Sequence, residues 1–286
     1  MRKPSCPSTT ASSQADQTAG HTRILAVTSG KGGVGKTNVV ANLAAGLAEM
    51  GKRVIILDAD FGLANIDVLL GLNPQFHLGH VLYGKKSLNE IMVEGPSGVR
   101  IIPASSGLQT LAELTLDQRN YLVQSFADLA GDADYLLIDT AAGISINVLH
   151  FLLAAPEVVV VSAPEPTAIV DAYAVIKIVL AEDPAKTIRV LINSVSDEDE
   201  SRDVFRQINS VVKRFLNREV IYLGHIERDP NVVKAIRRQV LVTQSYPSSP
   251  ASRCFRKLAR AVALQGEAPA TAHTFVWEKL LNHWIN

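Results

Sequence analysis

The sequence predicts an α/β fold in which a doubly wound, mostly parallel sheet is covered by helices on both faces. Three observations support this fold class: short apolar runs rich in β-branched residues recur along the chain, helical patterns separate them, and a glycine-rich loop joins the first run to the first helix. Continuous apolar runs are typical of strands buried on both faces, and parallel strands need crossover connections, which are usually helices. With 286 residues, 47% of them hydrophobic, the chain can bury the core of one large domain, which we prefer to two small ones.

The expected strands are seven apolar runs: ILAVTS, RVIILDAD, VRIIPAS, YLLIDT, EVVVVSAP, IRVLINS and EVIYLGHI. Between them, apolar residues recur at helical spacing in the segments NVVANLAAGLAEMG, DAYAVIKIVLAED and SRDVFRQINSVVKRFLN. The first of these segments ends at Gly51, and glycine is common just beyond the end of a helix. The order of the segments is therefore the alternation that a parallel sheet requires.

Composition changes at both ends of the chain. Residues 1–22 are rich in Ser, Thr, Gln, Ala and Pro and lack the apolar core of a signal peptide, so we expect a disordered tail. The α/β domain should span residues 23–264, followed by an Ala/Pro/Thr-rich linker at residues 265–273. Nowhere do about 18 apolar residues follow one another, so no membrane-spanning segment is expected.

The last segment, residues 274–286, predicts an amphipathic, membrane-targeting helix. Its apolar half consists of Val276, Trp277, Leu280, Leu281, Trp284 and Ile285. Tryptophan side chains settle at the level of lipid headgroups, and the preceding linker would let the helix reach a bilayer. We therefore expect peripheral, reversible attachment to the inner face of the cytoplasmic membrane. The alternative is that this helix packs on its own domain or on a dimer partner.

Charge and cysteine content narrow the classes of function. Lys plus Arg and Asp plus Glu both number 28, so no net field would draw the chain onto nucleic acid, and DNA is not an expected partner. Cys6 and Cys254 lie far apart, which suits a cytoplasmic protein without a disulfide framework. The histidines show no ligand spacing, and His77 with His80 in FHLGH predicts a solvated turn. We therefore expect no protein-bound transition metal.

The loop SGKGGVGKT has the composition and position of a phosphate-binding P-loop. It matches G-x-x-x-x-G-K-[ST] between an expected strand and an expected helix, which favours a nucleoside polyphosphate over a glycine turn without ligand. Lys36 should reach the β- and γ-phosphates, and the Thr37 hydroxyl should ligate Mg²⁺. The expected ATP-binding residues of the loop are Gly30, Lys31, Gly32, Gly33, Val34, Gly35, Lys36, Thr37 and Asn38.

Three aspartates at the ends of two expected strands could complete a site for phosphate transfer. Asp139 ends YLLID, while Asp58 and Asp60 end IILDAD. Hydrolysis needs a carboxylate near the metal and a group that positions water, whereas a single aspartate at a strand end is sometimes only a turn former. Because the three aspartates accompany a phosphate loop, we assign them to the site, with Asp139 holding the metal through a water molecule.

The form KGGVGKT resembles the signature loop of the deviant Walker-A ATPases of the MinD/ParA family, and the resemblance runs over residues 23–264. It implies Mg-dependent hydrolysis of ATP to ADP and phosphate, with Lys31, Lys36 and Asp60 as the catalytic residues. Lys31 would cross into the partner subunit of a homodimer that encloses ATP. Asp60 would orient the attacking water, and Asp58 would lie in the outer shell of the magnesium ion.

The resemblance also implies contacts on the base side of the nucleotide. Asn193 in LINS would hydrogen-bond adenine, and Arg228 and Pro230 would lie on the same side. The sequence departs from the family's usual pattern here, because IERD stands where IPxD is common, with Glu227 in place of a proline. The base-side contacts are therefore the least specific part of the expected site.

Longer matches resemble the branch of this family that regulates the number and placement of flagella. They include GKTNVVANLA, DADFGLANIDVLLGL and RDPNVVKAIRRQ. This resemblance implies two further kinds of partner: a flagellar GTPase of the signal-recognition type, and flagellar switch or transcription-control proteins. The tail stretch DQTAGHTR, residues 16–23, faintly resembles an element that activates such a GTPase, although a plain disordered tail is the favoured interpretation.

Other functions stay open beside the flagellar one. A MinD-type regulator of the division site would share the ATPase and the membrane helix. A ParA-like partition ATPase would bind DNA through the basic stretches KAIRR and RCFRKLAR, although spaced arginines usually mark a solvated helix surface. A non-catalytic scaffold would keep nucleotide only as a structural ligand.

Overall fold

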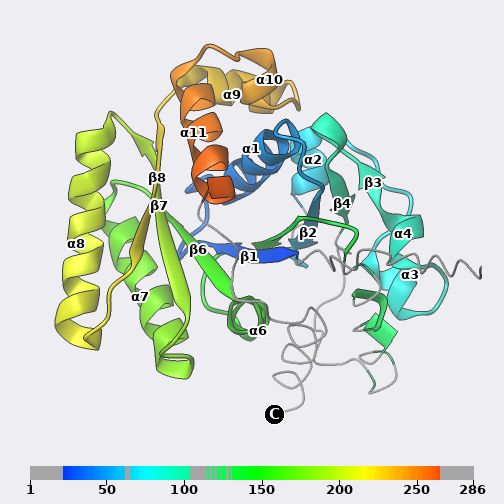
Figure 1. Cartoon of the computed structure of the whole chain (residues 1–286), viewed down its shortest axis with the longest axis horizontal. Helices are drawn as coiled ribbons and strands as arrows, with labels where there is room; N and C mark the ends of the chain where they lie inside the picture. Colours follow the sequence, from blue (N-terminus) through cyan, green and yellow to red (C-terminus); the bar gives the residue numbers. More distant parts are fainter. Residues whose placement is uncertain are drawn as a thin grey trace, which may run out of the picture.

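A sheet of eight strands forms the middle layer of the computed structural model (Figure 1). Its order is β3-β4-β2-β5-β1-β6-β7-β8, and each neighbouring pair is parallel except β3 with β4. The strands are β1 (Arg23–Thr28), β2 (Val54–Ala59), β3 (Val93–Glu94), β4 (Arg100–Ile102), β5 (Tyr135–Thr140), β6 (Glu157–Ser162), β7 (Thr187–Val195) and β8 (Ile221–Glu227). The structure describes residues 22–61, 65–103, 115, 118, 121–122, 124–126, 129 and 131–264.

The doubly wound, mostly parallel sheet that the sequence predicts is confirmed, and each expected apolar run contributes a strand. Only β3 was not expected, because it has two residues and pairs antiparallel at the edge of the sheet. The linker 265–273 and the amphipathic helix 274–286 lie outside the described residues, as does the tail before Thr22. In the part of the chain that is described, no helix is long and apolar enough to cross a bilayer.

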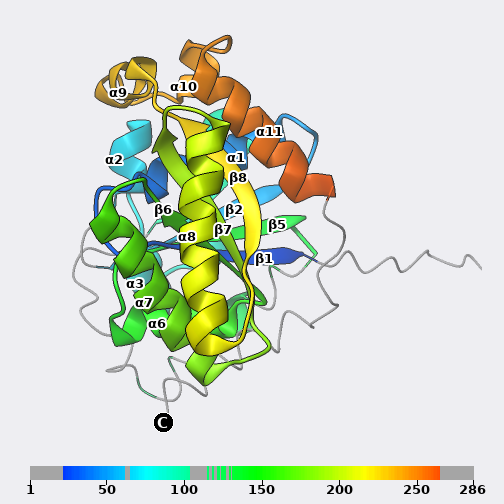
Figure 2. The ribbon, with the colours of Figure 1, turned by 90° about the vertical axis from the view of Figure 1, so that its left-hand side faces the viewer.

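Helices cover both faces of the sheet (Figures 1 and 2). One face carries α1 (Lys36–Ala48), α2 (Ile66–Leu70), α9 (Pro230–Arg237), α10 (Val242–Ser245) and α11 (Pro250–Leu264). The other face carries α3 (Leu78–Leu82), α4 (Leu88–Ile91), α6 (Ile146–Ala154), α7 (Pro166–Glu182) and α8 (Glu198–Leu216). Successive residues of a strand point to opposite faces, so in β1 the side chains of Ile24 and Ala26 join one core and those of Leu25 and Val27 join the other.

The tightest helix contact brings α11 against α1, side by side in both views (Figures 1 and 2). A Cβ on Gly46 would lie 2.9 Å from the Cβ of Ala259, so glycine allows the two helices to approach closely. The stretch RCFRKLAR lies within α11, where Arg253 and Arg260 are exposed, as expected for spaced arginines on a solvated helix surface. The opposite face of the helix is buried through Cys254, Phe255 and Leu258.

Capping residues explain why two helices begin at residues that hydrophobic periodicity did not predict. The helix expected from Ser201 starts earlier, at Glu198, because the Asp197 carboxylate accepts a hydrogen bond from the Glu200 N–H at 2.8 Å. His77 and His80 do not form the solvated turn expected from FHLGH. His77 instead caps α3 by accepting from the Gly79 N–H, and His80 in turn accepts from the His77 N–H.

A buried ionic network joins three strands to the last described helix. The Glu157 carboxylate of β6 accepts from Arg23 of β1 at 2.5 and 2.8 Å and from Arg189 of β7 at 2.7 Å. Arg23 also donates to the Val262 carbonyl of α11. Burial alone would raise the pKa of Glu157, but the hydrogen bonds from both arginines outweigh it and hold the pKa below its usual range. The network thus fixes α11 to the sheet through largely buried charges.

We expect Glu157→Gln to lower the free energy of unfolding by about 3–5 kcal/mol, because it leaves Arg23 and Arg189 buried without a counter-charge. Urea unfolding followed by circular dichroism measures the change. The matched control is Glu219→Gln, which breaks an ion pair with Lys213 whose side chains are 63% and 66% exposed and which should change stability little. Equal losses in the two variants would contradict a structural role for the buried network.

Candidate functional site

The phosphate loop lies between the end of β1 and the start of α1, at the carboxyl edge of the sheet. Gly33 and Gly35 have φ angles of +86° and +88°, a left-handed conformation that glycine adopts without strain. A Cβ at Gly32 or Gly33 would meet no atom within 4 Å, so the loop opens toward free space on this side. At Gly35 a Cβ would lie 2.4 Å from the Asn193 side-chain nitrogen, so any other residue there would also displace the Asn193 side chain.

A cavity of about 390 Å³ opens at this loop. Its lining residues come from the loop, from the two strand ends beside it and from two neighbouring helices: Ser29, Gly32, Gly33, Val34, Gly35, Lys36, Thr37, Asn38, Asp60, Asn65, Val68, Leu69, Ala142 and Ile236. The structure therefore brings most of the expected loop residues and Asp60 together around one space. The cavity is of the size that small-molecule sites usually have.

Sheet register brings the two buried carboxylates of the site onto neighbouring strands. Asp58 at the end of β2 stands opposite Asp139 in β5, and Val27 of β1 stands opposite Asp139 on its other side. The Lys36 ammonium lies 2.6 Å from the Asp139 carboxylate, and both side chains are almost completely buried. The lysine that is expected to bind phosphate is thus already held at the metal-side carboxylate.

Both carboxyl groups bind protons more tightly than exposed aspartates do. Burial raises the pKa of Asp58 to about 7, and the charge of Asp139 adds to the rise. Burial also raises the pKa of Asp139, although Lys36 and the Thr37 hydroxyl oppose that shift. The Asp58 carboxylate accepts hydrogen bonds from the backbone N–H groups of Asp60, at 3.1 Å, and of residues 65 and 66.

These residues fit a magnesium ion beside a nucleotide. Magnesium prefers hard oxygen donors, and the Thr37 hydroxyl with the Asp58 and Asp139 carboxylates supplies them within one buried cluster. Burial raises the pKa of both carboxyl groups, and a divalent cation would supply the counter-charge that favours their ionised forms. The carboxylates, the hydroxyl and the open backbone of the loop together suit a magnesium nucleotide.

Lys31 occupies a different place from Lys36. Its ammonium pairs with the Glu165 carboxylate at 2.6 Å and donates to the Thr167 hydroxyl at 3.1 Å, at the exposed start of α7. It does not line the cavity that Lys36 lines. The two lysines of the loop therefore point to different surroundings within one chain.

Three residues expected near adenine lie outside the cavity lining. The Asn193 side-chain amide donates to the Val34 carbonyl at 2.7 Å and so stabilises the conformation of the phosphate loop. Arg228 contacts the Ser194 carbonyl at 3.5 Å, and Pro230 begins α9. Their contacts with a base stay predictions.

Sequence reasoning missed the part of the lining that comes from α2 and α9. Asn65, Val68 and Leu69 approach the cavity from α2 and its start, and Ile236 approaches it from α9. The stretch FGLANID was recognised as following the aspartates, but α2 has five residues, too few for a helical period to stand out. Exposed apolar side chains at the mouth of the site, such as Val68 and Ile236, were the available signal.

The raised pKa of Asp58 predicts an unusual pH dependence of stability in the nucleotide-free protein. The folded state keeps the proton up to about pH 7, whereas the unfolded chain releases it near pH 4, so this contribution to stability is present below about pH 4 and is lost as the pH rises to about 7. The free energy of unfolding of the wild type, minus that of Asp58→Asn, should fall by up to about 4 kcal/mol over this interval.

Urea titrations at a series of pH values measure this difference. Asp134→Asn is the control of opposite sign, because its hydrogen bond with Arg53 lowers the pKa of Asp134, and that contribution is lost as the pH falls. A flat difference for Asp58→Asn would show that the carboxyl group is ionised in the folded protein.

Comparison with known proteins agrees with this geometry. A family model described as ParA: NUBPL iron-transfer P-loop NTPase matches residues 20–263. The antiactivator FleN of Pseudomonas aeruginosa is 45% identical over 240 residues, which cover 84% of this chain and 86% of FleN. The flagellum site-determining protein YlxH of Helicobacter pylori is 36% identical over 248 residues, covering 84% of this chain and 81% of YlxH.

Solved structures show the same fold. A chain of the MinC:MinD cell division protein complex of Aquifex aeolicus superposes with a TM-score of 0.70 at 26% identity, covering 86% of this chain and 97% of the other. The septum site-determining protein MinD of Pyrococcus horikoshii, complexed with Mg-ADP, gives a TM-score of 0.67 at 26% identity, covering 85% and 96%. The chain therefore belongs to the ParA/MinD family of P-loop NTPases.

Proposed function

We propose that the protein is a Mg-dependent ATPase that dimerises around ATP and acts as a membrane-associating switch controlling the number and placement of flagella. The similarity to FleN and to YlxH over most of the chain supports the flagellar role, in the branch known as FlhG or FleN. The observation that carries the switch is the separation of the two lysines: Lys36 lies inside its own cavity and Lys31 lies outside it.

Residues of one chain would bind the nucleotide and prepare the attack of water. Lys36 would leave Asp139 to hold the β- and γ-phosphates, while the loop N–H groups surround them. Thr37 would ligate magnesium directly, with Asp58 and Asp139 holding it through water, and the bound ion would neutralise charge on the phosphate oxygens. Asp60, which lines the cavity, would orient the water that attacks the γ-phosphate.

The second chain would supply the remaining positive charge. Among the described residues, the ammonium of Lys31 pairs with the exposed Glu165 carboxylate and donates to Thr167, and ion pairs at the surface are weak. Two such chains that face one another across their cavities would offer each Lys31 the phosphates of the other site. The γ-phosphate would then favour the dimer because it adds binding energy to that state alone.

Substitutions in the loop should separate binding, dimerisation and turnover. We expect Lys36→Ala to abolish nucleotide binding, and Asp60→Ala to bind ATP and stay dimeric with turnover reduced at least about 100-fold. Lys31→Ala should bind ATP and remain monomeric, whereas the wild type is dimeric with ATP and monomeric with ADP. Light scattering and phosphate release measure these properties.

Lys52→Ala, which removes an exposed lysine just after α1, is the matched control for charge and should behave as wild type. A dimer of Lys31→Ala with ATP, or a wild-type dimer that forms equally with ADP, would remove the proposed role of Lys31.

Membrane attachment rests on the helix proposed for residues 274–286. Burial of its six apolar side chains in the bilayer would contribute on the order of 10 kcal/mol of binding free energy, at roughly 1.5–3 kcal/mol each. Ordering about a dozen residues costs a similar amount, so one helix should bind weakly. Two helices on an ATP dimer gain from effective concentration, which makes attachment depend on nucleotide.

We expect the protein to sediment with anionic liposomes in ATP and much less in ADP. Trp277→Glu and Leu281→Glu should lose this binding, because each places a charge in the apolar half of the helix. Asn282→Glu, in the polar half, is the control. Equal sedimentation in both nucleotides would refute the coupling, and no lipid binding in either would leave the helix to pack on protein.

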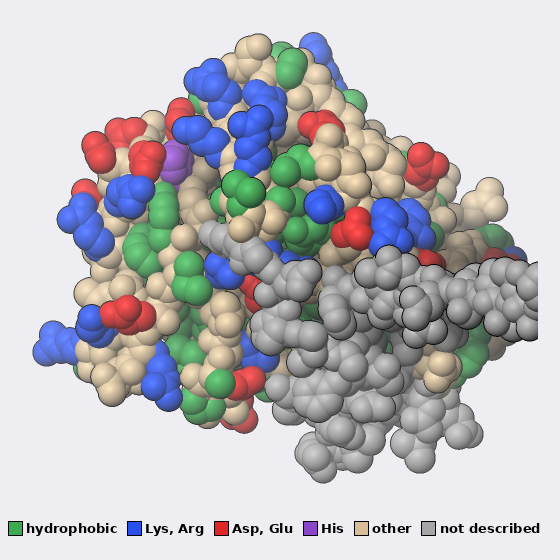
Figure 3. Space-filling view, in the orientation of Figure 1, with side chains coloured by type: hydrophobic (Ala, Val, Ile, Leu, Met, Phe, Trp, Pro, Cys, Tyr) green, Lys and Arg blue, Asp and Glu red, His purple; other side chains and the backbone are tan. Residues whose placement is uncertain are grey.

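Two other functions found within the family are alternatives to the flagellar role. A MinD-type division regulator is favoured by the MinD structures that superpose over most of the chain. A DNA-binding partition ATPase is favoured by basic side chains that gather over α9 and α11 (Figure 3): Lys234, Arg237, Arg238, Arg253, Arg256, Lys257 and Arg260. Local charge of this kind can bind DNA even though the net charge is zero.

Binding assays with candidate partners distinguish the flagellar, division and partition functions. The flagellar role requires the ATP-bound protein to bind a flagellar GTPase of the FlhF type or a flagellar switch or transcription-control protein. Capture of a division inhibitor instead would favour the MinD-type role. Steeply salt-dependent binding to random duplex would favour partition.

A further inference from the structure

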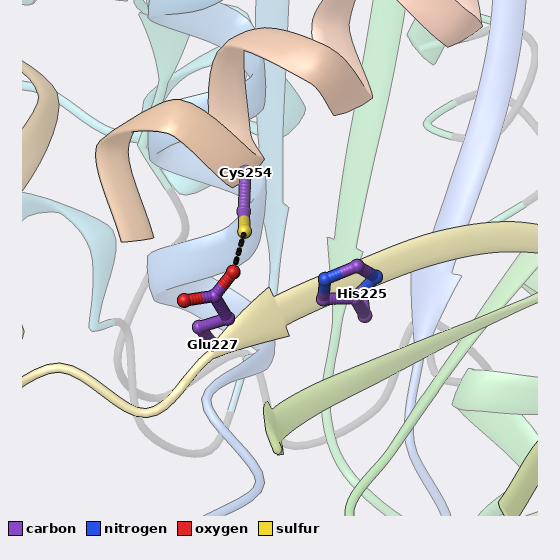
Figure 4. Close-up of side chains that lie close together, drawn as sticks. All are labelled: His225, Glu227 and Cys254. Atoms are coloured by element: carbon purple, nitrogen blue, oxygen red, sulfur yellow. Dashed lines mark hydrogen bonds between the residues drawn. The ribbon is translucent and has the colours of Figure 1, made fainter. Parts of the chain in front are cut away.

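We propose that His225, Glu227 and Cys254 form a binding site for a divalent transition-metal ion of the zinc class, at the junction of β8 and α11. A ligand atom from each of the three residues lies within 4.8 Å of the other two. The Cys254 sulfur lies 3.7 Å from a Glu227 carboxylate oxygen, and Figure 4 shows this contact with the His225 ring beside it. The site is separate from the nucleotide cavity and does not depend on the proposed ATPase.

The fold explains why these residues meet. His225 and Glu227 are two positions apart at the end of β8, the edge strand of the sheet, where its register with β7 shifts between Asn193 and Val195. Cys254 lies in the second turn of α11, which packs against β8, and its side chain is buried. The sequence predicts no transition-metal site because Cys254 lies far along the chain from the strand and has no neighbouring cysteine. The proposed site departs from that expectation.

A second layer of contacts orients the histidine. The Tyr222 hydroxyl lies 3.2 Å from Nδ1 of His225 and 2.9 Å from the Ser201 hydroxyl. Histidines that bind metals commonly have one ring nitrogen fixed by such a partner, which sets the tautomer and leaves the other nitrogen for the ion. Tyr222 is therefore a positioning residue rather than a ligand.

A cavity of about 160 Å³ is lined by His225 and Cys254 and leaves room for a fourth donor. Glu198, paired with Arg202 at 2.6 Å, lines this cavity, as does Lys257. Lys257 is exposed, and its flexible stem lets the ammonium group turn to solvent when a cation binds. Water or Glu198 would complete four-fold coordination.

The donor set selects the class of ion. A thiolate, an imidazole and a carboxylate suit zinc and its neighbours in the first transition series, whereas magnesium and calcium prefer oxygen alone. Tetrahedral zinc places such donors roughly 3.5 Å apart, so modest side-chain rotations close the site. Burial raises the pKa of the Cys254 thiol, so the empty site holds a thiol, whose proton passes to solvent as the sulfur–metal bond forms.

Cobalt and zinc titrations of the full chain test the proposal, with Mg-ADP present to occupy the nucleotide site. We expect about one Zn²⁺ per chain, a melting temperature raised by several degrees, and a cobalt–thiolate charge-transfer band. Cys254→Ser should lose the band, and His225→Asn and Glu227→Gln should bind zinc at least about tenfold more weakly. Tyr222→Phe should keep the band and bind about tenfold more weakly.

Two variants serve as matched controls: Cys6→Ser removes the other cysteine of the chain, and His77→Asn removes a histidine that caps α3. Both should bind metal as the wild type does. Melting of each variant in chelator, compared with wild type in chelator, separates loss of the ion from loss of folding. A cobalt–thiolate band that persists in Cys254→Ser, or zinc affinity unchanged in both Cys254→Ser and His225→Asn, would overturn the site.

Discussion

The buried contact between Lys36 and Asp139 is the interaction on which the rest of the site depends. A charged lysine and a charged aspartate tolerate burial only as partners, and strand order places them together because β5 lies between β1 and β2. The same order sets Asp58 opposite Asp139 and leaves the phosphate loop directly above both. Sheet topology, the positions of the acidic residues and the cavity are thus consequences of one arrangement of parallel strands.

Much of the fold could be predicted because its signals are local and long. The strands appear in the sequence as continuous apolar runs, and the helices α1, α7 and α8 are long enough for helical periodicity to be recognised. The elements that escaped are short or depend on distant partners. β3 has two residues, Val93 and Glu94, and is defined by its pairing with β4. α3 begins where His77 and His80 cap it, and hydrophobic periodicity does not reveal such a cap.

The candidate site divides in the same way. The loop and its aspartates follow from spacing, because a strand, a turn and a helix fix their geometry within a few residues. The placement of Asn193 behind the loop and of Ile236 at the cavity mouth depends on how β7 and α9 pack, which spacing does not reveal. Glu227 illustrates the difference: in the sequence it is a departure from a family pattern, whereas in the fold it faces His225 and Cys254.

The contact of Gly30 with α7 ties the phosphate loop mechanically to the opposite layer of the molecule. A Cβ at this position would stand 2.3 Å from the backbone carbon and oxygen of Asp171, so loop and helix touch without any side chain between them. Backbone atoms cannot rotate away as a side chain can, and Lys31 contacts Glu165 and Thr167 at the start of the same helix. Movement of the loop toward α7 would therefore press on the backbone of the helix itself rather than on a side chain that could turn aside.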